Sequence, residues 1–512
     1  MPRITRRDFM KAAGGFVSAA ALSPNMLQSA VAADGKKLNI LLLMTDQHCH
    51  SVLGCAGNRV VKTPNLDRLA GEGARFTNAV CATPFCSPTR ASMITGKWPH
   101  AHGIVQNVDG ARRRGLDDKV EATEQILFDQ GVRTFQMGKW HLGEATDLRC
   151  YRREQDMLST DAYIQSRRAL TPDMWDKPRK GEVRIGDVCY TPEMAEYHKT
   201  WSHGRQGSGQ NLSMIGRSLL PARRNYESWL ADRCVDLIEK YGGNQFMITW
   251  SANPPHAEWI VPDPYYGMYD PARVPLASSW SDRPAAYRDC IAAQMGGTMG
   301  EARAREMVRC YYGQVSMMDW CIGRILDSLR EKGLEDNTLV IFTSDHGDMQ
   351  GSHGMIGKSL PGYYEEIVRV PLIVRCPGVI KPGTVIDTHA NTVDLAPTLL
   401  EFAGRKPLED SQGVSLRPLL EGGAKSDDRP GFCERGLGDT GGWSRMVRTR
   451  EWKYAYFSDG RRELFNLAKD PGEVKNLRED TGASADMKAM HKKLVAQAEK
   501  SKDPALAHLV KV

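Results

Sequence analysis

Short apolar runs that end in polar residues recur along the chain. They lie within residues 38–44, 244–256, 337–348 and 370–378. Such runs are typical of central parallel strands, because both faces of these strands are buried. Residues 316–333 have an amphipathic helical pattern, and a shorter helix is expected to begin with Thr63 as cap and Pro64 in its first turn and to end at Gly71. The alternation predicts an α/β fold with a doubly wound, mostly parallel sheet flanked by helices.

Two other regions have a different composition. Residues 150–235 are rich in Arg, Lys, Gly, Pro and Tyr and show little periodicity, which predicts long insertion loops over the sheet. Trp175, Tyr190 and Trp201 either lie in solvated loops or shape a substrate cleft, and the sequence leaves both open. Residues 445–467 alternate apolar and polar positions around the turn sequence SDGR, which predicts a β-hairpin. A helical tail follows it.

The first residues resemble an export signal. The segment TRRDFMK carries twin arginines, a weakly apolar stretch follows, and AVAAD offers a cleavage site after Ala32. This order is typical of the twin-arginine route. We therefore expect residues 1–32 to be a signal, residues 37–424 a catalytic domain, and residues 425–512 a smaller α+β subdomain. The expected location is periplasmic or secreted, after passage through the twin-arginine translocon.

The bulk composition excludes several classes of protein. No apolar run approaches the ~18 residues that span a bilayer, so we expect no membrane insertion. The formal net charge is +6, of which the signal accounts for about half, and no dense basic block with aromatic residues suggests a nucleic-acid partner. Twelve cysteines in 512 residues do not form a disulfide scaffold. Nothing in the sequence indicates an oligomeric state.

Polar side chains gather where the predicted strands end. Asp46 and Gln47 follow the first run, His256 follows the second, and Asp345 with His346 follows the third. Functional groups in open α/β sheets collect at the carboxyl ends of the strands. Oxygen ligands from two strands, with an amide and an imidazole beside them, could hold one divalent cation.

Three further positions suggest chemistry on an anion. Lys139 and His141, in GKWHLG, could hold an anion and move a proton, and Lys358 lies on a Gly-rich loop that could fold over the site. Cys86, in CSPTR, has no local signature of a thiol protease, and the spacing to Arg90 differs from the phosphate loop of cysteine phosphatases. The sequence identifies no disulfide partner for Cys86.

The C-x-P-x-R segment that begins at Cys86 resembles the signature of type I sulfatases. The segments TPNLDRLA, CSPTRASMITG, GKWHLG, SDHGD and GKSLPGYYEEIVRVPLIV resemble that family as well, in the same order, and the likeness runs from about residue 37 to 480. The resemblance implies an alkaline-phosphatase-like fold and hydrolysis of sulfate esters. It also implies that a formylglycine-generating enzyme oxidises Cys86 to Cα-formylglycine.

The resemblance further implies a role for each matching residue. Asp46, Gln47, Asp345 and His346 would hold a calcium ion together with the modified Cys86. Many sulfatases have Asp in place of Gln47 and Asn in place of His346, which leaves the choice of divalent metal open.

The remaining matches concern the substrate. Arg90 would orient the hydrated formylglycine, and Lys139 and His141 would flank it. His256 and Lys358 would contact the sulfate and the leaving-group oxygen. Asn107 matches an asparagine near the metal in some relatives, and we expect it to bind substrate.

Three readings of function remain at this stage. The sequence favours an exported sulfuric ester hydrolase that acts on sulfated carbohydrate, although aryl sulfates and choline sulfate also fit. A phosphonate monoester or phosphodiester hydrolase with the same fold and modification is the main alternative. The third is an unmodified, glycan-binding protein without activity, which the complete set of polar positions argues against.

Overall fold

The computed structural model describes residues 38–108, 115–116, 120–143, 148, 150, 157–158, 163, 171–201, 214–358, 360–406, 408–423, 428–437 and 442–511. The expected export signal, residues 1–32, lies outside the described residues. No helix in the described part of the chain is both long enough and apolar enough to cross a membrane.

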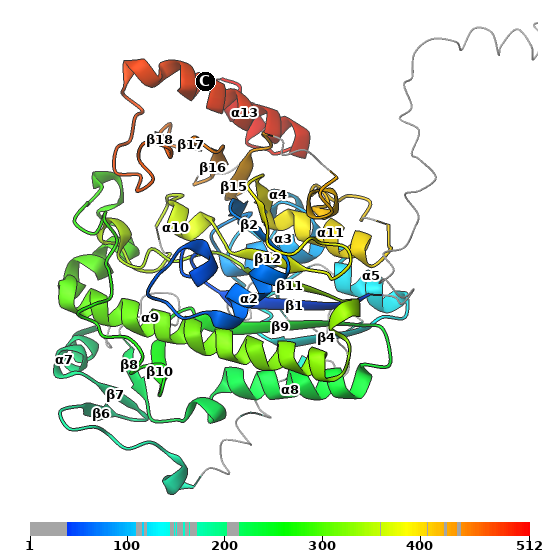
Figure 1. Cartoon of the computed structure of the whole chain (residues 1–512). Helices are drawn as coiled ribbons and strands as arrows, with labels where there is room; N and C mark the ends of the chain where they lie inside the picture. Colours follow the sequence, from blue (N-terminus) through cyan, green and yellow to red (C-terminus); the bar gives the residue numbers. More distant parts are fainter. Residues whose placement is uncertain are drawn as a thin grey trace, which may run out of the picture.

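An eight-stranded sheet forms the centre of the molecule (Figure 1). Its order is β13 (Thr384–Ile386), β2 (Ala74–Phe76), β12 (Leu372–Arg375), β11 (Thr338–Ser344), β1 (Asn39–Asp46), β9 (Phe246–Pro255), β4 (Arg133–Gly138) and β5 (Met157–Leu158). The five strands from β11 to β5 are mutually parallel, whereas β12 is antiparallel to both β11 and β2. The mostly parallel sheet predicted from the apolar runs is confirmed, with β12 as its antiparallel member.

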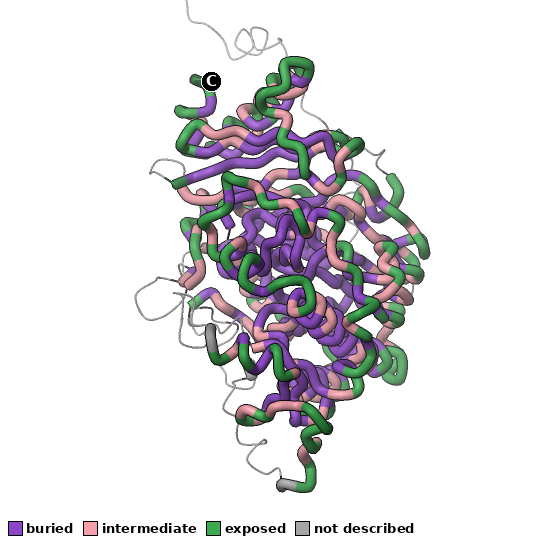
Figure 2. The backbone as a smooth tube through the Cα atoms, turned by 90° about the vertical axis from the view of Figure 1, so that its left-hand side faces the viewer, coloured by how far each residue is buried: buried purple, intermediate pink, exposed green. Residues whose placement is uncertain are grey.

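Helices cover both faces of this sheet, which explains the continuous apolar runs. On β1, Leu41 and Leu43 pack into one core, and Ile40 and Leu42 pack into another. The first core includes residues of α8 (Tyr226–Tyr241) and α9 (Ile291–Glu331), and the second includes residues of α11 (Leu395–Phe402). In Figure 1, α8 and α9 lie below the sheet and α3 (Cys86–Thr95) and α11 lie above it. All eight residues of β1 are buried. The buried backbone gathers in the interior of the molecule, and the exposed segments lie around it (Figure 2).

The first helix differs from its prediction in its cap. Helix α2 spans Pro64–Glu72, and Thr63 precedes it without a side-chain capping bond. The Thr63 hydroxyl instead donates to the Asp67 carboxylate at 3.0 Å and accepts from Gly54 N. Thr63 therefore occupies the predicted N-cap position, but its side chain does not cap the helix, because these two groups already use its hydroxyl.

Regular structure occurs in the region expected to form insertion loops. Strands β6 (Val183–Ile185), β7 (Val188–Tyr190) and β8 (Ile215–Ser218) join β10 (Trp259–Pro262) in a second sheet. Helix α7 (Pro192–Trp201) precedes β8, and α8 follows it. Tyr190 is a buried core residue of β7, so it does not shape a cleft. The side chain of Trp201 lies outside the described residues.

The C-terminal part forms an antiparallel sheet of β15 (Gly431–Arg435), β16 (Ser444–Arg448), β17 (Trp452–Phe457) and β18 (Arg462–Asn466). The SDGR turn joins β17 to β18, where Gly460 has a φ of 84°. Helix α13 (Ser484–Ser501) packs on one face of this sheet through an apolar cluster. The predicted hairpin and tail helix are both confirmed. A two-stranded pair, β3 (Ala79–Val80) and β14 (Ala390–Asn391), lies beside β15.

Candidate active site

The carboxyl ends of three adjacent strands bring the predicted polar residues together. Asp46 is the last residue of β1, Asp345 directly follows β11, and His256 directly follows β9. In the parallel register Thr45 pairs with Ser344, and Asp46 pairs with Pro255 after a local irregularity. Residues that are about 300 positions apart in the sequence therefore share one edge of the sheet.

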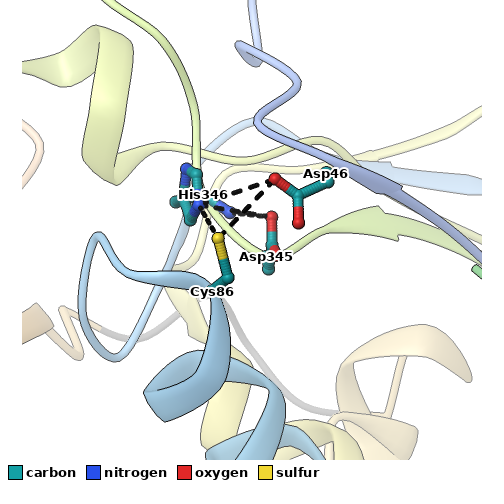
Figure 3. Close-up of side chains that lie close together, drawn as sticks. All are labelled: Asp46, Cys86, Asp345 and His346. Atoms are coloured by element: carbon teal, nitrogen blue, oxygen red, sulfur yellow. Dashed lines mark hydrogen bonds and ion pairs between the residues drawn. The ribbon is translucent and has the colours of Figure 1, made fainter. Parts of the chain in front are cut away.

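Cys86 is the first residue of α3, and its side chain lies at this edge of the sheet. Phe85 before it is extended, with a φ of −134°, and Pro88 lies in the first turn, where a missing N–H costs nothing. Every residue of α3 is buried, and Cys86 itself is 1 % exposed. The helix therefore directs the Cys86 side chain toward Asp46, Asp345 and His346 at the strand ends (Figure 3).

Cations and imidazoles surround the Cys86 sulfur. Lys358 Nζ lies 2.7 Å from Cys86 Sγ, His346 Nε2 lies at 3.2 Å and Lys139 Nζ at 3.7 Å. The Asp46 carboxylate lies 3.8 Å from the same sulfur. Burial and Asp46 act to raise the pKa of Cys86, but the two ammonium groups outweigh them and hold it well below its usual range. The position is built to stabilise a negative charge.

Lys139 is placed by the end of β4. Gly138, with a φ of 81°, lies so close to β9 that a Cβ there would be 2.1 Å from Ser251 O. This approach allows Lys139 N to donate to Ser251 O at 2.8 Å. The Lys139 ammonium then forms an ion pair with Asp46 at 2.7 Å.

Arg90 lies one turn along α3 and binds the two carboxylates. Its guanidinium donates to Asp345 at 2.9 Å, to Asp46 at 3.0 Å, and to both Lys139 O and Ser251 Oγ at 2.8 Å. These four hydrogen bonds hold the carboxylates of Asp46 and Asp345 in place. The resemblance assigned Arg90 to the modified cysteine, but the hydrogen bonds described here go to its neighbours.

Both histidines of the site donate a hydrogen bond through Nδ1. His346 Nδ1 lies 3.0 Å from Gly347 O and His256 Nδ1 lies 2.7 Å from Ala257 O, so each Nδ1 carries the proton and donates it. Each Nε2 lies within hydrogen-bond distance of Lys358 Nζ, at 2.8 Å for His346 and 3.2 Å for His256. Burial and Lys358 act to lower the pKa of His346, but Asp345 and Cys86 outweigh them and raise it. Burial and the nearby Lys358 lower the pKa of His256.

The side-chain oxygen of Gln47 is a candidate metal ligand. Its amide Nε2 donates to Asp348, and its backbone, at a φ of 66°, is held by Asp345 and by the Tyr311 hydroxyl. Within the described residues, the buried Gln47 Oε1 has no hydrogen-bond partner. This oxygen is thus fixed and unsatisfied, as a metal ligand would be.

The other candidate ligands lie together. Ligand atoms of Asp46, Cys86, Asp345 and His346 all lie within 4.8 Å of one another (Figure 3). Carboxylate and amide oxygens suit calcium, and the Nε2 of His346 is an imidazole nitrogen of the kind that divalent metals bind. The residues present therefore fit one divalent cation.

Two predicted residues lie at the margin of this cluster. Asn107 Oδ1 accepts from Ser87 N at 3.2 Å, so it contacts the first turn of α3. His141 follows β4, is partly buried and has a φ of 60°. The other predicted site residues form direct hydrogen bonds or ion pairs with one another.

Sequence reasoning missed three residues that support the site. Asp348 fixes the Gln47 amide, Ser251 binds Arg90, and Tyr311 of α9 donates to Gln47 O at 2.6 Å. Asp348 was visible in the segment SDHGD, where it follows the predicted ligands by two residues. Nothing in the local sequence distinguishes Ser251 or Tyr311.

Comparisons with known proteins agree with this geometry. The family model described as Sulfatase matches residues 38–405, and the one described as N-sulphoglucosamine sulphohydrolase, C-terminal, matches residues 351–500. An arylsulfatase of Clostridium perfringens is 29% identical over 463 residues, which cover 86% of this chain and 90% of that one. An N-acetylglucosamine-6-O-sulfatase of Bacteroides thetaiotaomicron is 27% identical over 477 residues, covering 86% and 83%.

A solved structure shows the same fold. The phosphonate monoester hydrolase of Agrobacterium radiobacter matches with a TM-score of 0.72 at 23% identity, covering 92% of this chain and 97% of that one. The alkaline-phosphatase-like fold expected from the sequence is thereby confirmed.

Proposed function

The chain belongs to the sulfatase family and is a sulfuric ester hydrolase, and from this premise we propose that it removes sulfate from sulfated carbohydrate with a formylglycine made from Cys86 and one calcium ion. We propose further that it works outside the cytoplasm after export by the twin-arginine route, which would allow a formylglycine-generating enzyme to modify Cys86 before export. The single observation that carries the proposal is the position of Cys86, between the carboxylates at the strand ends and two ammonium groups.

Two groups that the chain would acquire supply chemistry of their own. A calcium ion held by Asp46, Gln47, Asp345 and His346 would neutralise charge on a sulfate oxygen. Hydrated formylglycine carries two hydroxyls on one carbon, of which one can attack sulfur and the other can later release sulfate, which a serine or cysteine cannot do.

Lys139 and Lys358 would bind the substrate. A sulfate ester resists an anionic nucleophile because its outer oxygens carry negative charge. Both ammonium groups lie within 3.7 Å of the atom that stands at the nucleophile position, so they are placed to neutralise that charge as the bond to sulfur forms. Arg90 would keep Asp46 and Asp345 in the geometry that this arrangement needs.

His256 and His141 would move protons. The Nε2 of His256 accepts from Lys358 at 3.2 Å, so this pair can pass a proton to the leaving alcohol. His141 follows β4 by three positions and would take the proton of the second hydroxyl, as the family resemblance implies.

The carbohydrate preference rests on the relatives. The Bacteroides relative is named for N-acetylglucosamine 6-sulfate, and the C-terminal family model is named for N-sulphoglucosamine. Both names describe sulfated amino sugars, which we propose as the substrate class.

The test compares esters of sulfur and phosphorus. Protein produced with its maturation enzyme should hydrolyse 4-nitrophenyl sulfate and sulfated glucosamines much faster than an aryl phosphonate monoester. Cys86→Ala should abolish turnover, and mass spectrometry of the Cys86 peptide should show formylglycine. A strong preference for the phosphonate would instead support the alternative hydrolase, and an unmodified cysteine in active protein would contradict the proposal.

A further inference from the structure

A cavity of about 490 Å³ lies next to the proposed active site, between the C-terminal sheet and the start of α3. This volume is in the range of binding sites for small ligands. Three segments of its wall adjoin catalytic groups: Phe85 precedes Cys86, Asn107 binds the first turn of α3, and Pro361 follows Lys358 by three positions. The cavity therefore lies beside the residues around Cys86, where the rest of a substrate would extend from its sulfate.

Arg435, the last residue of β15, lines this cavity. Its guanidinium lies 4.8 Å from the ring centre of Phe85 and 5.5 Å from that of Tyr363, and it donates to Gly362 O at 3.1 Å. In the part of the chain that the structure describes, no carboxylate lies within 4.0 Å of Arg435, and its buried Nε has no hydrogen-bond partner. A positive charge held between aromatic rings is thus left uncompensated.

The neighbouring arginines show how unusual this is. Arg445 and Arg448, on the adjacent strand β16, are paired with the buried carboxylates of Asp503 and Glu365. Arg461, which lines the same cavity, lies 3.5 Å from Glu463 and 3.9 Å from Asp459. Leaving a largely buried cation without a counter-ion is costly, so an anion from outside would be bound favourably.

Polar groups at the rim of the cavity are suited to a sugar. Gln106, Ser458 and Asp459 are exposed and line the opening with an amide, a hydroxyl and a carboxylate. Such groups pair with the hydroxyls of a saccharide, whereas an unpaired guanidinium binds the oxygens of a sulfate or a carboxylate in a fork.

We propose that this cavity is a subsite in which Arg435 binds a second anionic group of the saccharide, either a sulfate or a carboxylate. The proposal rests on the proposed function, because it assumes that a sulfated saccharide places its scissile ester at Cys86. It narrows the substrate class to saccharides with at least two negative charges.

The test measures selectivity between saccharides that differ by one charged group. One pair is N-acetylglucosamine 6-sulfate and N-sulfoglucosamine 6-sulfate, which differ by one sulfate. The other pair consists of two disaccharides in which N-acetylglucosamine 6-sulfate is linked either to glucose or to glucuronic acid, so they differ by one carboxylate. Each is measured as a competitive inhibitor of 4-nitrophenyl sulfate hydrolysis. We expect the wild type to prefer the more charged member of at least one pair by about 10–100-fold, the contribution of one charge-assisted contact. The pair that responds distinguishes sulfate from carboxylate.

Variants assign the preference to Arg435. Arg435→Gln should reduce the ratio of the two inhibition constants to less than about threefold, and Arg435→Lys should restore part of it. Arg461→Gln, which removes the same charge from the same cavity, should leave most of the preference. Equal inhibition by both members of both pairs in the wild type would overturn the proposal, and so would equal losses in the Arg435 and Arg461 variants.

The same experiment separates this proposal from the proposed function. If protein with formylglycine hydrolyses neither 4-nitrophenyl sulfate nor the sulfated glucosamines, the proposed function fails. Calorimetric binding of the same saccharide pairs then still decides whether Arg435 selects the second charge. If hydrolysis occurs without any charge preference, the subsite alone fails.

Discussion

Replacing Arg90 with glutamine should lower the free energy of unfolding by about 3–5 kcal/mol, measured without metal, as expected when one partner of a buried ion pair is removed. The Arg90 side chain is 5% exposed, and the side chains of Asp46 and Asp345 are fully buried. The substitution removes the attraction but leaves both carboxylates buried beside each other. Two charge-assisted bonds at about 1.5–3 kcal/mol each give a similar figure.

The measurement is urea unfolding followed by tryptophan fluorescence in a chelating buffer. Arg330→Gln is the matched control, because Arg330 pairs with Asp327 at 3.3 Å on the surface, and its loss should cost less than about 1 kcal/mol. Adding calcium should stabilise Arg90→Gln more than the wild type, because the cation would replace part of the missing positive charge. A loss no larger than that of the control would refute the reasoning.

Three further perturbations test separate parts of the site and the fold. Asp348→Ala should weaken calcium binding about 10–100-fold, because the Gln47 amide loses the partner that orients it, and calorimetry measures this. Lys358→Gln should reduce kcat/KM for 4-nitrophenyl sulfate about 10²–10³-fold, because an ammonium group beside Cys86 is lost. Burial raises the pKa of Glu124 to about 7, so the stability held by its neutral form is complete below about pH 4.5 and is lost as the pH rises through 7. Glu124→Gln should therefore equal the wild type in acid and exceed its stability by about 3 kcal/mol at pH 8 in urea unfolding.

Each of these has a result that would contradict it. Unchanged calcium affinity in Asp348→Ala would mean that Gln47 is held by its backbone contacts alone. Undiminished turnover by Lys358→Gln, in protein that melts like the wild type, would remove Lys358 from the site. A pH-independent difference between Glu124→Gln and the wild type would show that Glu124 is not buried as a neutral acid.

The sequence by itself determined the middle strands of the central sheet and the polar residues that follow them. A strand covered on both faces is mostly apolar, so β1, β9 and β11 were visible as mostly apolar runs. Their polar ends were visible for the same reason, because Asp46 and Asp345 mark the points at which the apolar requirement stops. The C-terminal hairpin was equally local, since its alternation and its turn sequence lie within one short segment.

Only the tertiary structure decided how these residues act on one another. Arg90 binds Asp345 across 255 positions, and Gln47 binds Asp348 across 301, so neither bond leaves a local pattern. The second sheet escaped prediction because its strands β6, β7 and β8 are three or four residues long, too short to show a period. The uncompensated charge of Arg435 follows from the carboxylates that the fold places elsewhere, and composition cannot reveal such an absence. Local periodicity indicates which residues are buried, whereas the partners of charged groups depend on the tertiary structure that brings distant residues together.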